Sequence, residues 1–173
     1  MTKPFEGSGE SVEPPLVITR TFNAPKELLW KTLTEADLLG QWWGPKGFKI
    51  EVKTLDLKPG GICHYSMTAA NGYLMWGKFV YREILAPDRL MFTNSFADAD
   101  GNAIKNPFLL KLALETLITV TLEEQDGKTS LTLHSIPINA TANEWTAFTG
   151  IITSMQQGFV GTFDQLDDLL QKQ

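Results

Sequence analysis

The chain has 173 residues, of which 43% are hydrophobic and 20% charged, and its net charge is -5. This length and composition are typical of a globular protein with one core. Charges of both signs are spread along the chain without a basic run, so we expect no nucleic-acid surface. No apolar stretch approaches the roughly 18 residues of a membrane span, and the N-terminus lacks the order of a signal peptide. These absences predict a soluble, cytoplasmic protein.

Residues 1–15 contain three prolines and few large apolar residues. Such a segment cannot bury enough surface to offset the entropy of ordering it, so a disordered tail is predicted there. Residues 16–173 are predicted to form a single domain. The domain opens with an alternating segment, residues 16–22, which favours a first strand.

Two short helices are predicted after this strand. Asn23 can cap the first, and Pro25 suits its first turn, so we expect a helix over residues 25–34. A second helix is predicted from Glu35 to about Trp42, where glycine and proline residues end the helical run.

The middle of the chain reads as strands joined by turns. Residues 48–57 alternate and then change parity, as a bulge would cause. Asn71-Gly72 is the strongest short hairpin signal in the chain. Further strands are predicted at residues 62–68, 73–84, 89–96, 116–124 and 129–135. Consecutive hairpin-linked strands indicate an antiparallel meander. Residues 98–112 are predicted to form an extended loop over its open end.

The last segment, residues 141–170, has the pattern of a long amphipathic helix. Thr141 and Glu144 fit a capping box at its start. Glycines at positions 150, 158 and 161 weaken it, and Gly150 could interrupt it. Its apolar stripe consists of Trp145, Phe148, Ile152, Met155, Phe159, Phe163, Leu166 and Leu170. One helix cannot bury such a stripe alone, so we expect a curved sheet to cover it.

Several short motifs then occur in a distinctive order. They are Asn23-Ala24-Pro25, Gln41-Trp42-Trp43-Gly44-Pro45, Lys58-Pro59-Gly60-Gly61, Gly77-Lys78-Phe79-Val80-Tyr81-Arg82-Glu83-Ile84 and Pro87-Asp88-Arg89-Leu90. The set resembles the START-like (SRPBCC) superfamily, in the branch named after the C-terminal domain of activators of the ninety-kilodalton heat-shock protein's ATPase. The resemblance implies an α+β helix-grip fold, in which a curved antiparallel sheet grips a long C-terminal helix and a cavity opens between them.

Aromatic and methionine side chains are typical of both core and adaptable pocket walls. His64 is a candidate for orienting a ligand by a polar contact. The predicted cavity wall consists of Trp43, Met67, Trp76, Phe92, Met155 and Phe159. The alternative for each is a place in the core, and alternation allows only one of Met75 and Trp76 to face inward.

No metal or cofactor site is predicted. Cys63 and His64 are adjacent on a strand, so they point to opposite faces, and His134 lies on another strand without a third ligand. A buried thiol is expected for Cys63. The Asp98 segment lacks the spacing of a calcium loop and is predicted to be a turn. We expect Glu115 to be exposed.

Three functions follow as hypotheses. The first is binding of a small apolar or amphipathic ligand in the cavity, without covalent chemistry. The second is a cyclase-type or hydrolase-type enzyme that uses His64 with a carboxylate as acid and base. The third, implied by the resemblance alone, is a protein-interaction module that contacts a chaperone.

Overall fold

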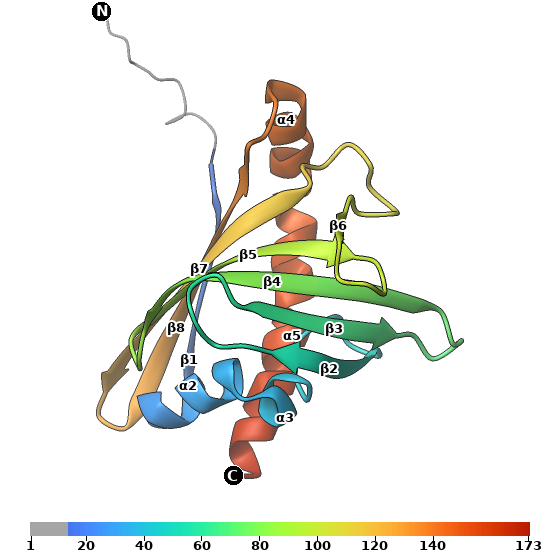
Figure 1. Cartoon of the computed structure of the whole chain (residues 1–173). Coiled ribbons are helices and arrows are strands. Elements are labelled where there is room, and N and C mark those ends of the chain that lie inside the picture. Colours follow the sequence, from blue (N-terminus) through green and yellow to red (C-terminus); the bar gives the residue numbers. More distant parts are fainter. Residues whose placement is uncertain (1–13) are drawn as a thin grey trace, which may run out of the picture.

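The structure, a computed structural model, describes residues 14–173 (Figure 1). The tail predicted over residues 1–15 therefore lies, apart from its last two prolines, outside the described residues. Within residues 14–173, eight strands form one antiparallel sheet with the order β1-β8-β7-β5-β4-β3-β2, and β6 pairs with β5. The strands are β1 Leu16–Phe22, β2 Lys49–Leu55, β3 Ile62–Thr68, β4 Leu74–Leu85, β5 Arg89–Ala97, β6 Ala103–Ile104, β7 Glu115–Gln125 and β8 Lys128–Ile138.

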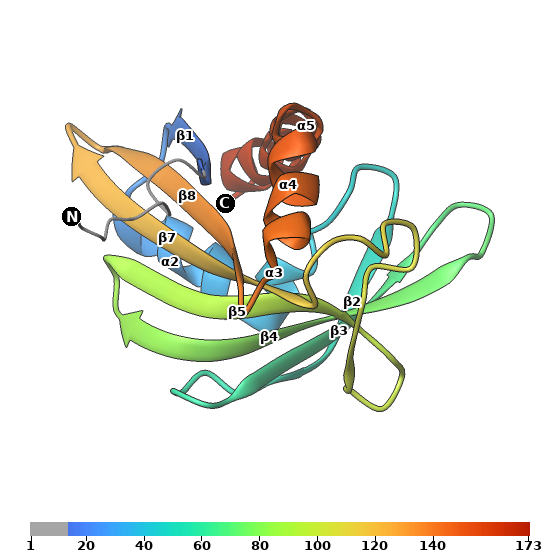
Figure 2. The same ribbon diagram turned by 90° about the horizontal axis from the view of Figure 1, so that it is seen from above.

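Helices lie on the concave side of this sheet. Their bounds are α2 Lys26–Thr34, α3 Ala36–Leu39, α4 Ala142–Gly150 and α5 Ile152–Gln171. Seen from above, the sheet curves around the axis of α4 and α5 (Figure 2). The short helices α2 and α3 lie across the lower end of the sheet in Figure 1. This arrangement confirms the predicted α+β helix-grip fold.

The turn between β7 and β8 and the bulge in β2 lie where local sequence patterns indicated them. Asp126 and Gly127 have positive φ angles of 55° and 79°, and Gln125 pairs with Lys128, so β7 and β8 are joined by a two-residue turn. That geometry is the one that Asp-Gly favours. The register of β2 shifts between Val52 and Thr54, which confirms the predicted bulge.

The C-terminal helix is divided in two. The Thr141 hydroxyl accepts from the Glu144 amide at 3.1 Å and the Glu144 carboxylate accepts from the Thr141 amide at 2.9 Å, which confirms the capping box. Ile151 leaves the helical geometry, with φ -116° and ψ 11°, directly after Gly150. The structure therefore has two helices, α4 and α5, where the stripe alone predicted one.

One predicted cap is wrong. The N-cap of α2 is Pro25, and Asn23 makes no capping bond. Instead, the first amide of the helix, that of Lys26, donates to the Glu124 carboxylate of β7 at 2.9 Å. A side chain distant in sequence thus satisfies the donor for which the local sequence offered Asn23.

The lower half of α5 closes the core. Phe163 and Leu166 are almost completely buried, and the Phe163 ring lies 6.0 Å from that of Phe22 and 6.3 Å from that of Trp42. Trp42 is also buried and donates through Nε1 to the Thr32 carbonyl at 2.8 Å. This tryptophan therefore closes one end of the core, with its polar N–H satisfied.

Candidate functional site

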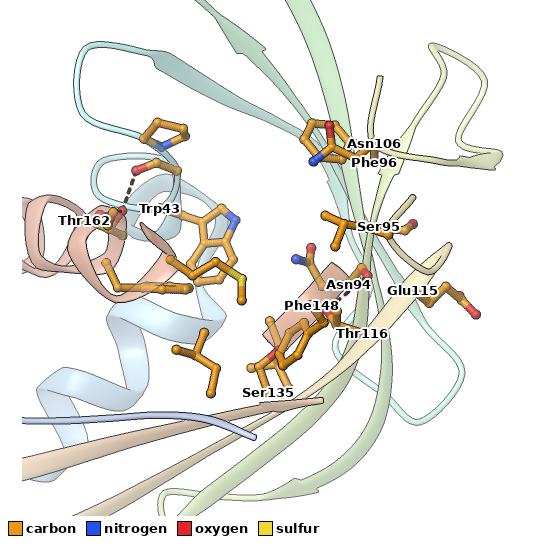
Figure 3. A pocket seen from close by; sticks show the side chains of 18 of the residues that line it. Trp43, Asn94, Ser95, Phe96, Asn106, Glu115, Thr116, Ser135, Phe148 and Thr162 are labelled. Carbon is orange, nitrogen blue, oxygen red and sulfur yellow. Dashed lines mark hydrogen bonds between the residues drawn. The ribbon is translucent and has the colours of Figure 1, made fainter. Parts of the chain in front are cut away.

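A cavity of about 520 Å³ lies between the upper half of the α4 and α5 axis and the concave face of the sheet (Figure 3). Protein interiors are close-packed and seldom contain voids much larger than a water molecule, so this space is not an ordinary packing defect. Exposed lining residues mark its opening, at Pro45, Lys46, Leu114 and Gly158.

Apolar side chains from both layers form most of the wall. The helices contribute Phe148, Met155 and Phe159, and the sheet contributes Met67 and Ile118. These residues share one surface because the helix stripe and the inward positions of the strands face each other.

Gly158 leaves part of the helix backbone bare beside this wall. A Cβ atom at Gly158 would have no other atom within 4 Å. Its neighbours on the helix face, Met155 and Thr162, also line the cavity. The glycine therefore adds to the free space beside the wall.

Helix α5 also fixes the loop that carries Trp43. The Thr162 hydroxyl donates to the Gly44 carbonyl at 2.9 Å, and the Gln165 amide donates to the carbonyls of Gly44 and Trp42 at 3.1 and 3.3 Å. The Trp43 indole is thereby held edge-on to Phe79, with ring centroids 5.1 Å apart. The tryptophan is a fixed part of the cavity wall.

Four of the seven predicted site residues line the cavity: Trp43, Met67, Met155 and Phe159. Phe92 does not line it. Its side chain is 1% exposed and packs behind the wall, with its ring 4.2 Å from that of Phe79.

His64 and Trp76 lie on the opposite face of the sheet. Cys63 and Tyr65 face the core, so His64 between them faces outward, where it stacks on Trp76 at 4.7 Å. Its Nε2 lies 3.0 Å from the Asp98 carbonyl. The Asp98 turn and Lys53, whose Nζ lies 5.4 Å from the Trp76 ring centre, cover this pair. Both residues therefore belong to a small outer cluster away from the cavity.

The polar part of the wall was not predicted from the sequence. Trp43 Nε1 donates to the Tyr65 hydroxyl at 3.1 Å, and that hydroxyl donates to Asn94 Oδ1 at 3.4 Å. Thr116 and Ser135 line the same wall from β7 and β8. Alternation could have found these residues, because Asn94 follows Phe92 by two positions and Thr116 precedes Ile118 by two.

Charged groups lie at the edge of the site. Lys46 is exposed at the opening, and the Glu115 carboxylate points away from the cavity (Figure 3). Glu115 as a whole residue is partly buried. The predicted exposure therefore applies to its carboxylate only.

The loop that follows β6 lines one side of the cavity through Leu112 and Leu114. Lys105 Nζ lies 2.9 Å from the Glu144 carboxylate and ties this loop to the start of α4. The Lys105 ammonium and the Thr141 backbone amide lower the pKa of Glu144.

Cys63 is a fully buried free thiol on the inner face of β3. Burial raises its pKa to about 12. Among residues 14–173, no group of three or more His, Cys, Asp or Glu side chains could hold a metal ion. In the same part of the chain, no helix combines the length and apolarity that crossing a bilayer requires.

Comparison with solved structures gives relatives that cover most of this chain. A crystal structure of a protein from Mycobacterium smegmatis is 28% identical, with a TM-score of 0.72 and 90% of each chain covered. Solution structures of proteins from Arthrobacter aurescens and Staphylococcus epidermidis are each 26% identical, with TM-scores of 0.76 and 0.70. They cover 91% of this chain, and 86% and 90% of their own.

No curated protein matches the chain. Residues 23–171 match the family described as Activator of Hsp90 ATPase homolog 1-like protein, which agrees with the branch that the sequence motifs resemble. The chain belongs to this family of Activator of Hsp90 ATPase homolog 1-like proteins.

Proposed function

We propose that this chain binds a small apolar or amphipathic molecule in the cavity between α5 and the sheet. The observation that carries the proposal is the contrast between the two halves of α5. On the C-terminal side of Thr162 the helix is packed tightly into the core. On the N-terminal side the same apolar stripe faces a cavity of about 520 Å³. Ligand pockets typically measure about 300–1,000 Å³ and are mostly apolar with a few polar groups.

Four of the predicted wall residues, Trp43, Met67, Met155 and Phe159, would contact the ligand. Trp43 is held in place by the bonds of α5 to its loop, so this part of the wall is preorganised. Met67 and Met155 are flexible and can adapt to the shape of the bound molecule.

The acid–base alternative depended on His64, and this residue lies on the outer face of the sheet. Within the wall, burial raises the pKa of Tyr65, so its hydroxyl stays protonated at neutral pH. A general base must reach the proton that it removes, which His64 cannot do here. The geometry therefore favours binding over catalysis by His64.

A pair of glycine variants tests the proposal. Gly158→Leu places four carbon atoms at the cavity wall, and Gly150→Leu places the same group in open space on α4, away from the cavity. Both changes favour the helical conformation, so both variants should fold. We expect Gly158→Leu to weaken binding of the neutral dye N-phenyl-1-naphthylamine about tenfold or more, and Gly150→Leu to bind as the unmodified chain does. Equal dye affinity in all three proteins would contradict the proposal.

The natural ligand can be sought in the same preparation. Native mass spectrometry of gently purified protein, followed by denaturing extraction, identifies any small molecule that is released on unfolding. We expect a released molecule that is apolar over most of its surface.

A second candidate function is contact with a chaperone of the Hsp90 kind, as the family description suggests. The observation that favours it is the loop after β6, where Phe108 is 64% exposed and Leu110 is 66% exposed. Exposed apolar groups of this kind mark protein contacts when they are contiguous. Stimulation of a purified Hsp90 ATPase that is lost in a Phe108→Ser, Leu110→Ser double variant would support this function. The absence of stimulation at saturating concentration would remove it.

A further inference from the structure

The polar part of the wall indicates which ligands the cavity would take. Resting on the proposed function, we propose that the ligand is uncharged and carries a hydrogen-bond acceptor, such as a carbonyl oxygen, which receives an N–H bond from the Asn94 side chain.

Two hydrogen bonds connect Trp43, Tyr65 and Asn94 along this wall. The indole Nε1 of Trp43 can only donate, so the Tyr65 oxygen accepts at 3.1 Å. The single hydroxyl proton of Tyr65 then goes to Asn94 Oδ1 at 3.4 Å. In this arrangement the Asn94 amide turns its oxygen toward Tyr65. Its two N–H donors are left for another partner.

That partner is missing among the residues that the structure describes. No described group accepts a hydrogen bond from Asn94 Nδ2, and the Asn94 amide is directed into the cavity (Figure 3). An amide donor in apolar surroundings is stabilised by an acceptor, and a bond formed there is stronger than in water. A bound ligand with an oxygen acceptor meets this requirement.

Neighbouring residues hold the Tyr65 ring in its place beside Asn94. Gly77 lies opposite Tyr65 on β4, and a Cβ atom there would come within 2.6 Å of Tyr65 Cε2, so the ring occupies the space that the glycine leaves. On its other side the ring packs against Phe79, with centroids 5.4 Å apart. Tyr65 is therefore a positioning residue for the Asn94 amide.

The absence of charge inside the described wall excludes an ionised ligand group there. Of the lining residues, Lys46 and Glu115 carry charge; Lys46 is exposed at the opening, and the Glu115 carboxylate points away from the cavity (Figure 3). Burial of a carboxylate or ammonium group without a partner costs far more than burial of a neutral group. The cavity therefore selects neutral molecules.

Three small probes on one aromatic body test this inference by equilibrium dialysis at neutral pH. 2-Acetylnaphthalene carries the carbonyl acceptor, 2-ethylnaphthalene has nearly the same shape without it, and 2-naphthoate is ionised. We expect the ketone to bind about tenfold more tightly than the hydrocarbon, because one hydrogen bond distinguishes them. The naphthoate should bind more weakly than either.

Two variants assign the preference to this part of the wall. Asn94→Leu keeps a similar shape without the donors, and the ratio of ketone to hydrocarbon affinity should fall to about one while the hydrocarbon affinity is retained. Tyr65→Phe keeps the ring but frees the amide to turn, so the ratio should fall to an intermediate value. A purely structural role of either residue would instead change both affinities together.

Each contrary result has a distinct meaning. If ketone and hydrocarbon bind equally well to the unmodified chain, the acceptor inference is wrong and the proposed binding function stands. A ketone preference that survives in Asn94→Leu overturns the assignment to Asn94. Tight binding of naphthoate overturns the selection of neutral ligands. If none of the probes binds, the proposed function fails, and this inference fails with it.

Discussion

The division of α5 into a packed half and a cavity half predicts that two phenylalanines one helical turn apart differ in their contribution to stability. The change in each case is truncation to alanine. Phe163 lies in the packed half, where it is 1% exposed and contacts Phe22 and Trp42. Phe159 lies in the cavity half, where it is partly buried and contacts Trp43 and Phe163.

The expected magnitudes follow from what surrounds each ring. Truncation of a fully buried phenylalanine costs about 3–5 kcal/mol, because an enclosed cavity is added to the lost transfer free energy. Phe159 already borders open space, so Phe159→Ala creates no new enclosed void. Complete burial of such a side chain is worth about 1.5–3 kcal/mol, and partial burial reduces the expected cost of Phe159→Ala to about 1–2 kcal/mol.

Urea unfolding followed by far-ultraviolet circular dichroism measures both free energies. With a slope of about 2 kcal/mol per molar urea, the midpoint should fall by roughly 2 M for Phe163→Ala and by less than about 1 M for Phe159→Ala. Dye binding should be altered by Phe159→Ala, since this residue lines the cavity. Equal loss of stability in the two variants would refute the division of the helix.

Three further changes have defined outcomes. Gly77→Ala should destabilise the fold by about 1–3 kcal/mol in urea unfolding, because its Cβ atom overlaps the Tyr65 ring; an unchanged midpoint would contradict this packing. Thr141→Ala should cost about 1 kcal/mol through loss of the α4 cap, measured as a lower melting temperature. Burial raises the pKa of Cys63 to about 12, so the stability that its protonation provides is present below about pH 8.5, the unfolded value, and is lost as the pH rises toward 12. Urea midpoints should fall over that range, and the native thiol should resist a disulfide reagent at neutral pH; rapid labelling would contradict its burial.

Local patterns in the sequence were sufficient for most of the architecture. The Asp126-Gly127 turn, the bulge in β2 and the capping box at Thr141 each depend on residues within a few positions of one another. Interactions between residues so close in the sequence can be predicted from local patterns, and together these patterns indicated a sheet around a helix. The cap on α2 failed for the opposite reason, because its partner Glu124 lies 98 residues away.

The site was less predictable, because residue type does not fix which face of a strand a residue occupies. Trp76 and His64 have the chemistry of pocket residues, yet their positions in β4 and β3 turn them outward. Nothing about the residue type of Asn94 indicates a ligand site. Its importance depends on Tyr65 and Trp43, which reach it from another strand and from a loop.

The residues that stabilise the fold therefore differ from those that would contact a ligand. Phe163 and Leu166 anchor the lower half of α5, and Trp42 closes the same end of the core. Asn94 and Gly158 lie above them, where the wall borders free space. Substitutions at such positions create no enclosed voids and leave the lower packing intact, so they should cost little stability. Ligand preference and stability should therefore respond to different substitutions in this chain, the first to Asn94→Leu and the second to Phe163→Ala.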